Sequence, residues 1–479
     1  MARRDDFQYR EFGVLVRNER ISAVHVANGL IQVLRAVGPN ARLGSEIMSE
    51  YPDEFEGEVT ALLDQRFPSG WKLTPEALAV SLVSTKEGPF SVVGDSPPPG
   101  RATLTEREYA RRSEVLVAGR SHLQKTFGDR IRDLTPAHQA AIASVLNADG
   151  RVAIAGASSP TTPGVAFAGY DTNYTFSLLH AATFLGLLAR TVAGQTALAQ
   201  LRKEVLKEGA HARFVELLGL QQTPQDSQPE HGLTLPSPAG PRWEEQAMNV
   251  AGLVTRLLAW SHLEGGAASP GQLLMSLVDL VGVFFSSSML RWTHVEAGTS
   301  GPLWGPKLLV VSPARADSRD HAGIAAAQRS IVTASARLLN NIIQDEAFLT
   351  PRGKGAKDFW LPTGAALALG AATGWVLPRD ARGGAKRYFS PGPRQLTTLV
   401  RALVSPHEDL SWSQLHERAS DQLGLWLGGH HDEQSAMLNV SANHITLARV
   451  GAVNQGHMIA LGLARQESDN VVRVHGGAL

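Results

Sequence analysis

The sequence predicts a mostly α-helical, multi-domain protein with a minor β component. Apolar residues recur at helical spacing through most of the 479 residues. Two proline-rich stretches, residues 94–100 and 221–241, interrupt this pattern, because proline lacks a backbone donor and fixes φ. A single hydrophobic core stops growing at roughly 250–300 residues, so we expect a chain of this length to divide into several domains.

These interruptions set the expected domain limits. We expect a helical domain at 1–93, a second helical domain with a short β-hairpin at 101–220, and a linker at 221–241. A third helical domain at 242–350 and a C-terminal domain with basic loops at 351–479 should follow. The linker has five prolines among glutamine, serine and aspartate, a composition that buries little apolar area.

In the first domain, the apolar spacing of residues 21–37 predicts a helix that ends at Gly38 and Pro39. A second helical region is expected over residues 45–67. Thr74 followed by Pro75 predicts the start of a further helix, because threonine caps helices and proline is favoured at their first position.

The second and third domains are expected to consist mainly of helices. Glycine-bounded apolar runs at 151–155 and 165–168 predict a hairpin, and residues 308–311 predict a strand or a buried connector. The expected helices cover residues 106–127, 136–146, 177–193, 196–218, 243–262, 270–292 and 321–348.

The C-terminal domain ends in a pattern of helices followed by two short strands. Ser411 predicts the cap of one helix, and residues 407–409 before it are interpreted as a polar turn. Expected helices cover residues 396–404, 412–423 and 442–463, and expected strands cover 463–466 and 471–475 around a turn at 467–470. Helices followed by a terminal two-stranded ribbon match a winged helix, so we expect a C-terminal winged-helix-like domain.

Positive charge is concentrated in residues 351–401, although the whole chain has a formal net charge of zero. This segment has nine basic and two acidic residues, which gives +7. Most of the basic residues lie in two glycine-containing loops, which can approach a phosphate backbone closely, and arginine supplies paired donors. Tyr388 and Phe389 follow the second loop and either stack on bases or pack in a core.

The loops and the winged element therefore provide the candidate nucleic-acid-binding residues, with DNA as the favoured ligand. The competing interpretation of the loops is solvated surface without a ligand. The candidates are Arg352, Lys354, Lys357, Arg379, Arg382, Lys386 and Arg387 in the loops, and Arg449, Arg465 and Arg473 in the winged element.

The sequence predicts no catalytic residue, no metal site and no cofactor. The chain has no cysteine, which excludes disulfides, cysteine zinc sites, iron–sulfur clusters and thiol nucleophiles. Phosphate-binding loops, GxSxG elbows and HExxH motifs are absent. Residues 430–433 (HHDE) form the densest group of potential metal ligands, but neighbouring loop residues cannot all face one ion, so we interpret them as a solvated loop.

Two features bear on localisation. Residues 273–290 are long and apolar enough for a membrane span, but Asp279 would cost about 2.5–3.5 kcal/mol at the bilayer centre, so a buried core helix is expected. The first residues lack the apolar stretch of a secretory signal, which favours a cytoplasmic protein. Only 9 of the 45 basic residues are lysine, a bias typical of GC-rich bacterial genes.

The leading hypothesis is a non-catalytic nucleic-acid-binding or scaffold subunit of a bacterial multi-protein complex, for which a phage-defence system is one setting. One alternative is a protein-interaction subunit that docks on a partner ATPase or nuclease without contacting nucleic acid. Another is an enzyme whose carboxylates and histidines converge from separate helices, with Asp345, Glu346, His180 and His294 as the residues to inspect.

Overall fold

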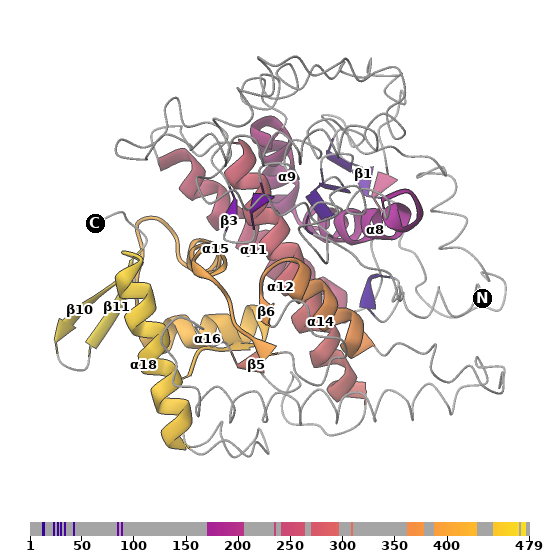
Figure 1. Ribbon diagram of the computed structural model, residues 1–479. Coiled ribbons are helices and arrows are strands. Elements are labelled where there is room, and N and C mark those ends of the chain that lie inside the picture. Colours follow the sequence, from indigo (N-terminus) through magenta and orange to yellow (C-terminus); the bar gives the residue numbers. More distant parts are fainter. Residues whose placement is uncertain are drawn as a thin grey trace, which may run out of the picture.

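The computed structural model of the chain describes a large helical region and several short segments. The described residues are 12–14, 23, 26–27, 29–30, 33–34, 42–43, 84–85, 88–89, 170–205, 234–235, 241–263, 270–296, 308–309, 362–377, 388–428, 444–468 and 471–475. Most of them are helical and few lie in strands, which confirms the mostly α prediction for this part of the chain (Figure 1). The elements expected at 45–67, 106–127, 136–146, 151–155, 165–168 and 321–348 lie outside it.

Most helices of the described region overlap expected ones. They are α8 (Tyr170–Ala189), α9 (Val192–Val205), α11 (Pro241–Leu263), α12 (Pro270–Glu296), α14 (Pro362–Ala372), α15 (Pro393–Leu403), α16 (Trp412–Leu423) and α18 (His444–Ala460). Helix α14 is not among the predicted elements, and α8 begins and ends several residues earlier than expected. Between α8 and α9 the chain breaks at Arg190 and Thr191, a few residues earlier than predicted. The Thr191 hydroxyl accepts a hydrogen bond from Gly194 N at 2.9 Å, so threonine begins α9.

The strands among the described residues are short and form five small sheets. Two pairs are parallel, β1 (Arg42–Leu43) with β4 (Thr234–Leu235) and β5 (Leu308–Leu309) with β9 (Leu425–Trp426). Two are antiparallel, β2 (Ser84–Thr85) with β3 (Gly88–Pro89) and β6 (Val376–Leu377) with β7 (Tyr388–Phe389). The fifth sheet has the order β10 (Ala464–Ser468), β11 (Val471–His475), β8 (Asp409–Ser411).

Two of these pairings refine the sequence analysis. Residues 308–309 form a strand, one of the two forms expected for that segment. Thr234 and Leu235, within the stretch interpreted as a linker, pair with Arg42 and Leu43 from the N-terminal part of the chain.

Helix α12 lies at the centre of the described core, between α11 and α14 (Figure 1). It is long and apolar enough to cross a membrane, but most of its side chains are buried against other helices of the molecule. The packing with α14 is close: a Cβ added at Gly282 would lie 2.1 Å from Thr373 Oγ1, so only glycine fits there. A single cluster of buried side chains extends from Phe12 through these helices to Val474.

Asp279 of α12 is fully buried and joins α12 to α15. Its carboxylate accepts hydrogen bonds from Gln395 Nε2 at 3.3 Å and Thr398 Oγ1 at 3.2 Å, and pairs with Arg394 Nη2 at 3.1 Å. Its backbone carbonyl accepts from Trp375 Nε1 at 2.9 Å. A buried charge is tolerated only where it is paired and hydrogen-bonded, and Asp279 meets both conditions.

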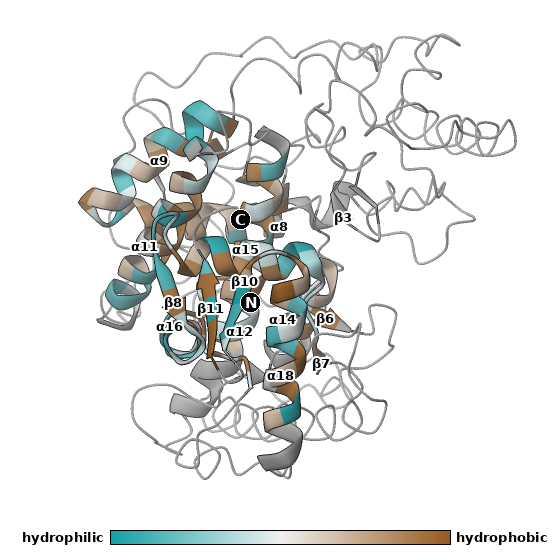
Figure 2. Ribbon diagram, turned by 90° about the vertical axis from the view of Figure 1, so that its left-hand side faces the viewer, coloured by the Kyte–Doolittle hydropathy of each residue, from teal (hydrophilic) through white to brown (hydrophobic). Residues whose placement is uncertain are grey.

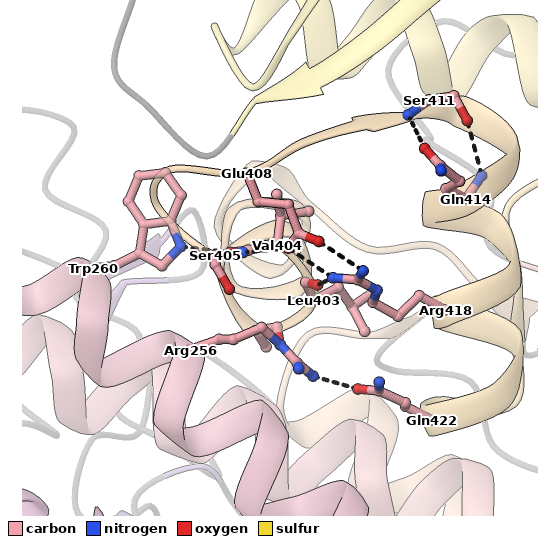
Figure 3. A network of polar contacts seen from close by, with 11 residues as sticks. Arg256, Trp260, Leu403, Val404, Ser405, Glu408, Ser411, Gln414, Arg418 and Gln422 are labelled. Atoms are coloured by element: carbon pink, nitrogen blue, oxygen red, sulfur yellow. Dashed lines mark hydrogen bonds and ion pairs between the residues drawn. The ribbon is translucent and has the colours of Figure 1, made fainter.

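The C-terminal end of α15 is held by side chains from α11 and α16 (Figure 3). The carbonyl of Ala402 accepts from Arg256 Nε at 2.6 Å, and that of Val404 accepts from Trp260 Nε1 at 2.8 Å. The carbonyl between them, Leu403, accepts from Arg418 Nη1 at 2.7 Å. The last carbonyls of a helix have no intrahelical partner and carry its negative dipole end, so arginine donors stabilise them.

Glu408 completes this network. It forms a two-point ion pair with Arg418, both contacts at 2.8 Å, and accepts from Ser405 N at 3.0 Å. Hydrogen bonds from Arg418 and then from Ser405 hold the pKa of Glu408 below its ordinary value. The sequence predicts a polar turn at residues 407–409. His407 and Glu408 do lie in a turn, but Asp409 begins strand β8.

We predict that Asp279→Asn lowers the free energy of unfolding by about 2–4 kcal/mol, because it leaves Arg394 without its charged partner. Urea denaturation followed by circular dichroism measures the change. Asp421→Asn removes an exposed carboxylate of α16 and should stay within about 0.5 kcal/mol of the parent protein. Equal effects of the two variants would contradict the structural role of Asp279.

Glu408→Gln should destabilise the protein in a pH-dependent way. The pKa of Glu408 is depressed in the folded state, so its contribution is full above the ordinary value of about 4.3 and is lost as pH falls through the folded pKa. The stability difference between the parent and Glu408→Gln, measured by denaturation from pH 7 to pH 3, should therefore shrink at acid pH. Glu417→Gln, at an exposed position of α16, controls for the loss of one carboxylate. A difference that is constant with pH would contradict the prediction.

Candidate nucleic-acid interface

The candidate interface is built on the three-stranded sheet at the C-terminal end of the described chain. Strand β11 lies in the middle, antiparallel to both β10 and β8, with Val474 opposite Ala464 on one side and Leu410 on the other. The sheet packs beside α16 and α18 (Figure 1). The predicted ribbon is present and β10 extends to Ser468, whereas the third strand, β8, is not among the predicted elements.

Ser411 connects β8 to α16, as its predicted capping role requires. Its hydroxyl accepts from Gln414 N at 3.3 Å, and the Gln414 side chain accepts from Ser411 N at 2.9 Å, which is a complete capping box. Gly424 ends α16 in the left-handed conformation with φ of 63°. The cap therefore fixes the position at which the edge strand becomes a helix.

Alternating side chains give the sheet a buried and an exposed face. Leu410, Val472, Val474 and Ala464 are buried against the helices. After Ala464, β10 consists of hydrophilic residues, whereas apolar and polar residues alternate in β11 from Val472 onward (Figure 2). The charged residues of the three strands are two arginines and two carboxylates, Arg465, Arg473, Asp409 and Glu467.

These four side chains form one ionic cluster. Arg465 and Arg473 are direct cross-strand partners, which brings two positive charges together. Glu467 bridges them: one carboxylate oxygen lies 3.0 Å from Arg465 Nη2 and the other 3.2 Å from Arg473 Nε. Desolvation acts to raise the pKa of Glu467, but the hydrogen bonds from both arginines lower it below its ordinary value.

Asp409 of β8 extends the cluster to the opposite edge of the sheet from β10. Its Oδ1 lies 2.7 Å from His475 Nδ1 and its Oδ2 lies 3.9 Å from Arg465 Nη2. The hydrogen bond from His475 lowers the pKa of Asp409. The Asp409 side chain is about half exposed, whereas that of His475 is buried. The pair links β8 to the end of β11.

Helix α18 lies beside the sheet and is anchored by close backbone contact. Gly428 has φ of 82°, and a Cβ there would lie 2.5 Å from Gly451 N, so the segment after β9 approaches α18 closely only with glycine. Asn454 Nδ2 donates to Leu427 O at 2.9 Å across the same contact. Arg449, Ala452 and Ala460 are the exposed positions among residues 448–460.

Comparison with known protein families, with curated protein sequences and with solved structures found no match to this chain.

Three of the candidate binding residues lie within the described region and seven do not. Arg465 and Arg473 are brought together on the sheet, and Arg449 is exposed on α18. The loop residues Arg352, Lys354, Lys357, Arg379, Arg382, Lys386 and Arg387 lie outside the described residues. The strands that precede and follow the second loop in the sequence, β6 and β7, pair with each other.

Three residues of the basic segment have structural roles that the charge count does not reveal. Phe389 is buried in the core, so of the two roles considered for it, packing is the observed one. Arg394 pairs with Asp279 of α12, and the Arg401 guanidinium lies 5.5 Å from the centre of the Trp260 ring. Part of the charge of residues 351–401 therefore stabilises the fold.

The residues considered for an enzymatic or metal-binding role form no site within the described region. No group of three or more potential metal ligands occurs among its residues. His180 is buried, with its ring edge-to-face on Phe285 at 5.4 Å. Asp345, Glu346 and residues 430–433 lie outside the described residues. His294 lies in α12, but its side chain is not described.

Glu467, Asp409 and His475 are members of the cluster that the sequence does not predict. The sequence places Glu467 in a turn and groups Asp409 with its polar neighbours. One local pattern does bear on the cluster: residues 471–475 alternate as in a strand, which predicts Arg473 and His475 on the same face. Their partners on β8 come from a segment more than 60 residues earlier, which no local pattern indicates.

Proposed function

We propose that this chain is a non-catalytic nucleic-acid-binding or scaffold subunit of a bacterial multi-protein complex, and that residues 393–475 form a winged-helix module. The observation that supports the proposal is the order α15, β8, α16, α18, β10, β11 combined with the sheet order β10-β11-β8. In a winged helix the first strand pairs with the last, and the last two strands form the wing. The further strand described between α16 and α18, β9, is only two residues long.

In this proposal α18 is the helix offered to a groove and β10–β11 is the wing. Arg449 on α18 and Arg465 and Arg473 on the wing are the described cations that would contact phosphates. Residues 378–387, which lie between β6 and β7 in the sequence, contain four basic residues and one acidic residue. Phosphate contacts fix orientation without reading sequence, so this set favours binding with little base specificity.

A second candidate function is docking on a protein partner through the same module. The exposed positions of residues 448–460 support it, because two of them, Ala452 and Ala460, are small and uncharged and only Arg449 is charged. The pairing of both wing arginines with carboxylates also supports it. Protein partners would then remain bound at salt concentrations that release nucleic acid.

A gel-shift and fluorescence-polarisation series tests the proposal. The variant lacking six loop charges, at Arg352, Lys354, Lys357, Arg382, Lys386 and Arg387, and the single variant Arg449→Ala should both bind duplex DNA more weakly. The slope of log K against log salt should flatten by about 0.9 for each phosphate that a variant no longer binds. Lys203→Ala, at an exposed position of α9, is the matched control and should bind like the parent.

Two results would count against nucleic-acid binding. One is a parent protein that binds neither DNA nor RNA at low salt. The other is unchanged binding by the six-charge variant and by Arg449→Ala. Salt-resistant co-purification of a partner protein, abolished on replacing Ala452 with a charged residue, would instead favour docking on protein.

A further inference from the structure

The cross-strand pair Arg465 and Arg473 departs from what sheet stability favours. Like charges directly opposite each other on a sheet are destabilising, and here two arginines are direct partners on the exposed face. Sequences that violate a local rule do so mainly at functional sites. The pair is compensated by a carboxylate beside both arginines, and this need for an anion makes the pair a candidate anion site.

Glu467 occupies the space between these arginines because of a backbone irregularity. The register shifts between Gln466 and Ser468: Gln466 faces Val472 and Ser468 faces Val471, so Glu467 is the extra residue of a β-bulge. Bulges change the direction of a side chain and often lie next to functional sites. This one places the Glu467 carboxylate against both guanidinium groups, with one oxygen for each.

We propose that Arg465 and Arg473 form a phosphate-binding site on the exposed sheet face, and that Glu467 is an internal carboxylate that a backbone phosphate of nucleic acid displaces. The inference rests on the proposed function and adds its regulation. A phosphodiester offers two non-bridging oxygens from one centre, as a carboxylate does, and arginine binds both groups in the same forked geometry.

Displacement of the Glu467 carboxylate by a phosphate should cost little free energy. The side chains of Arg465 and Arg473 are 49% and 41% exposed and that of Glu467 is 35% exposed, so these ion pairs form in contact with water. Exposed pairs contribute little to stability, and their exchange for a phosphate is inexpensive. Asp409 lies 3.9 Å from Arg465 and is hydrogen-bonded to His475, so Arg465 keeps a carboxylate nearby when Glu467 is displaced.

Removal of the internal carboxylate should therefore strengthen binding. We expect Glu467→Gln to bind a labelled duplex about two- to tenfold more tightly at low salt, with a steeper salt dependence, because both arginines become available to phosphate. Glu467→Asp keeps the charge but shortens the side chain, and should give a smaller gain. Glu244→Gln, at an exposed position of α11, changes the net charge equally and should bind like the parent.

The experiment uses the full chain, a labelled duplex of about 25 base pairs and fluorescence polarisation over a series of salt concentrations. Arg465→Ala/Arg473→Ala should weaken binding, and adding Glu467→Gln to this double variant should restore nothing. Thermal denaturation shows whether each variant is folded. If Glu467→Gln does not fold, the gain expected for Glu467→Asp is the deciding measurement.

The outcomes separate this inference from the proposed function. Weaker binding by the double arginine variant together with unchanged or weaker binding by both Glu467 variants would overturn the displacement and leave nucleic-acid binding intact. Equal gains for Glu467→Gln and Glu244→Gln would also overturn it, because a general charge effect would then suffice. Absence of binding by the parent and by every variant would overturn both proposals. Binding acquired only by Glu467→Gln would overturn displacement, because phosphate would then not displace Glu467 in the parent protein.

Discussion

The architecture of the described region depends on the C-terminal end of α15, where three consecutive carbonyls receive donors from two other helices. Arg256 and Trp260 of α11 bind the carbonyls of Ala402 and Val404, and Arg418 of α16 binds that of Leu403. A helix end needs such partners when it is buried. Because α11 and α16 lie more than 100 residues apart in the sequence, satisfying this one helix end joins two distant segments of the chain.

Charge balance at this junction is as important as its hydrogen bonds. Burial, with a further effect of the nearby Arg418, lowers the pKa of Arg256 to about 10, so the guanidinium is held at some cost but stays charged near neutrality. Glu408 compensates for the two cations through its ion pair with Arg418. At its first turns α15 is held by Asp279 of α12, so both ends of one short helix are fixed to the core. Strand β8, which follows α15 in the chain, therefore comes directly after a helix that is bonded to the core at both ends.

The sequence predicts the helices and the ribbon better than it predicts the contacts between distant segments. The Ser411 cap and the terminal ribbon are predictable because capping boxes and strand alternation are local patterns. Strand β8 is not predictable in this way, because three residues, Asp-Leu-Ser, carry no periodicity and pair with residues more than 60 positions later. Counting charges does not separate Arg394, which pairs with Asp279, from surface arginines, since that distinction depends on a partner in α12.

Counting charges also fails to describe the exposed face of the sheet, because both of its arginines are paired with a carboxylate. The strands carry two arginines and two carboxylates, so the face has little net charge to attract an anion from a distance. An anion that binds there must exchange with Glu467, and to replace both of its contacts it must offer two oxygens from one centre. Chloride cannot do this, and a phosphodiester can. Exchange would thus make the site selective for the geometry of the anion, while long-range attraction would fall to basic residues elsewhere in the chain.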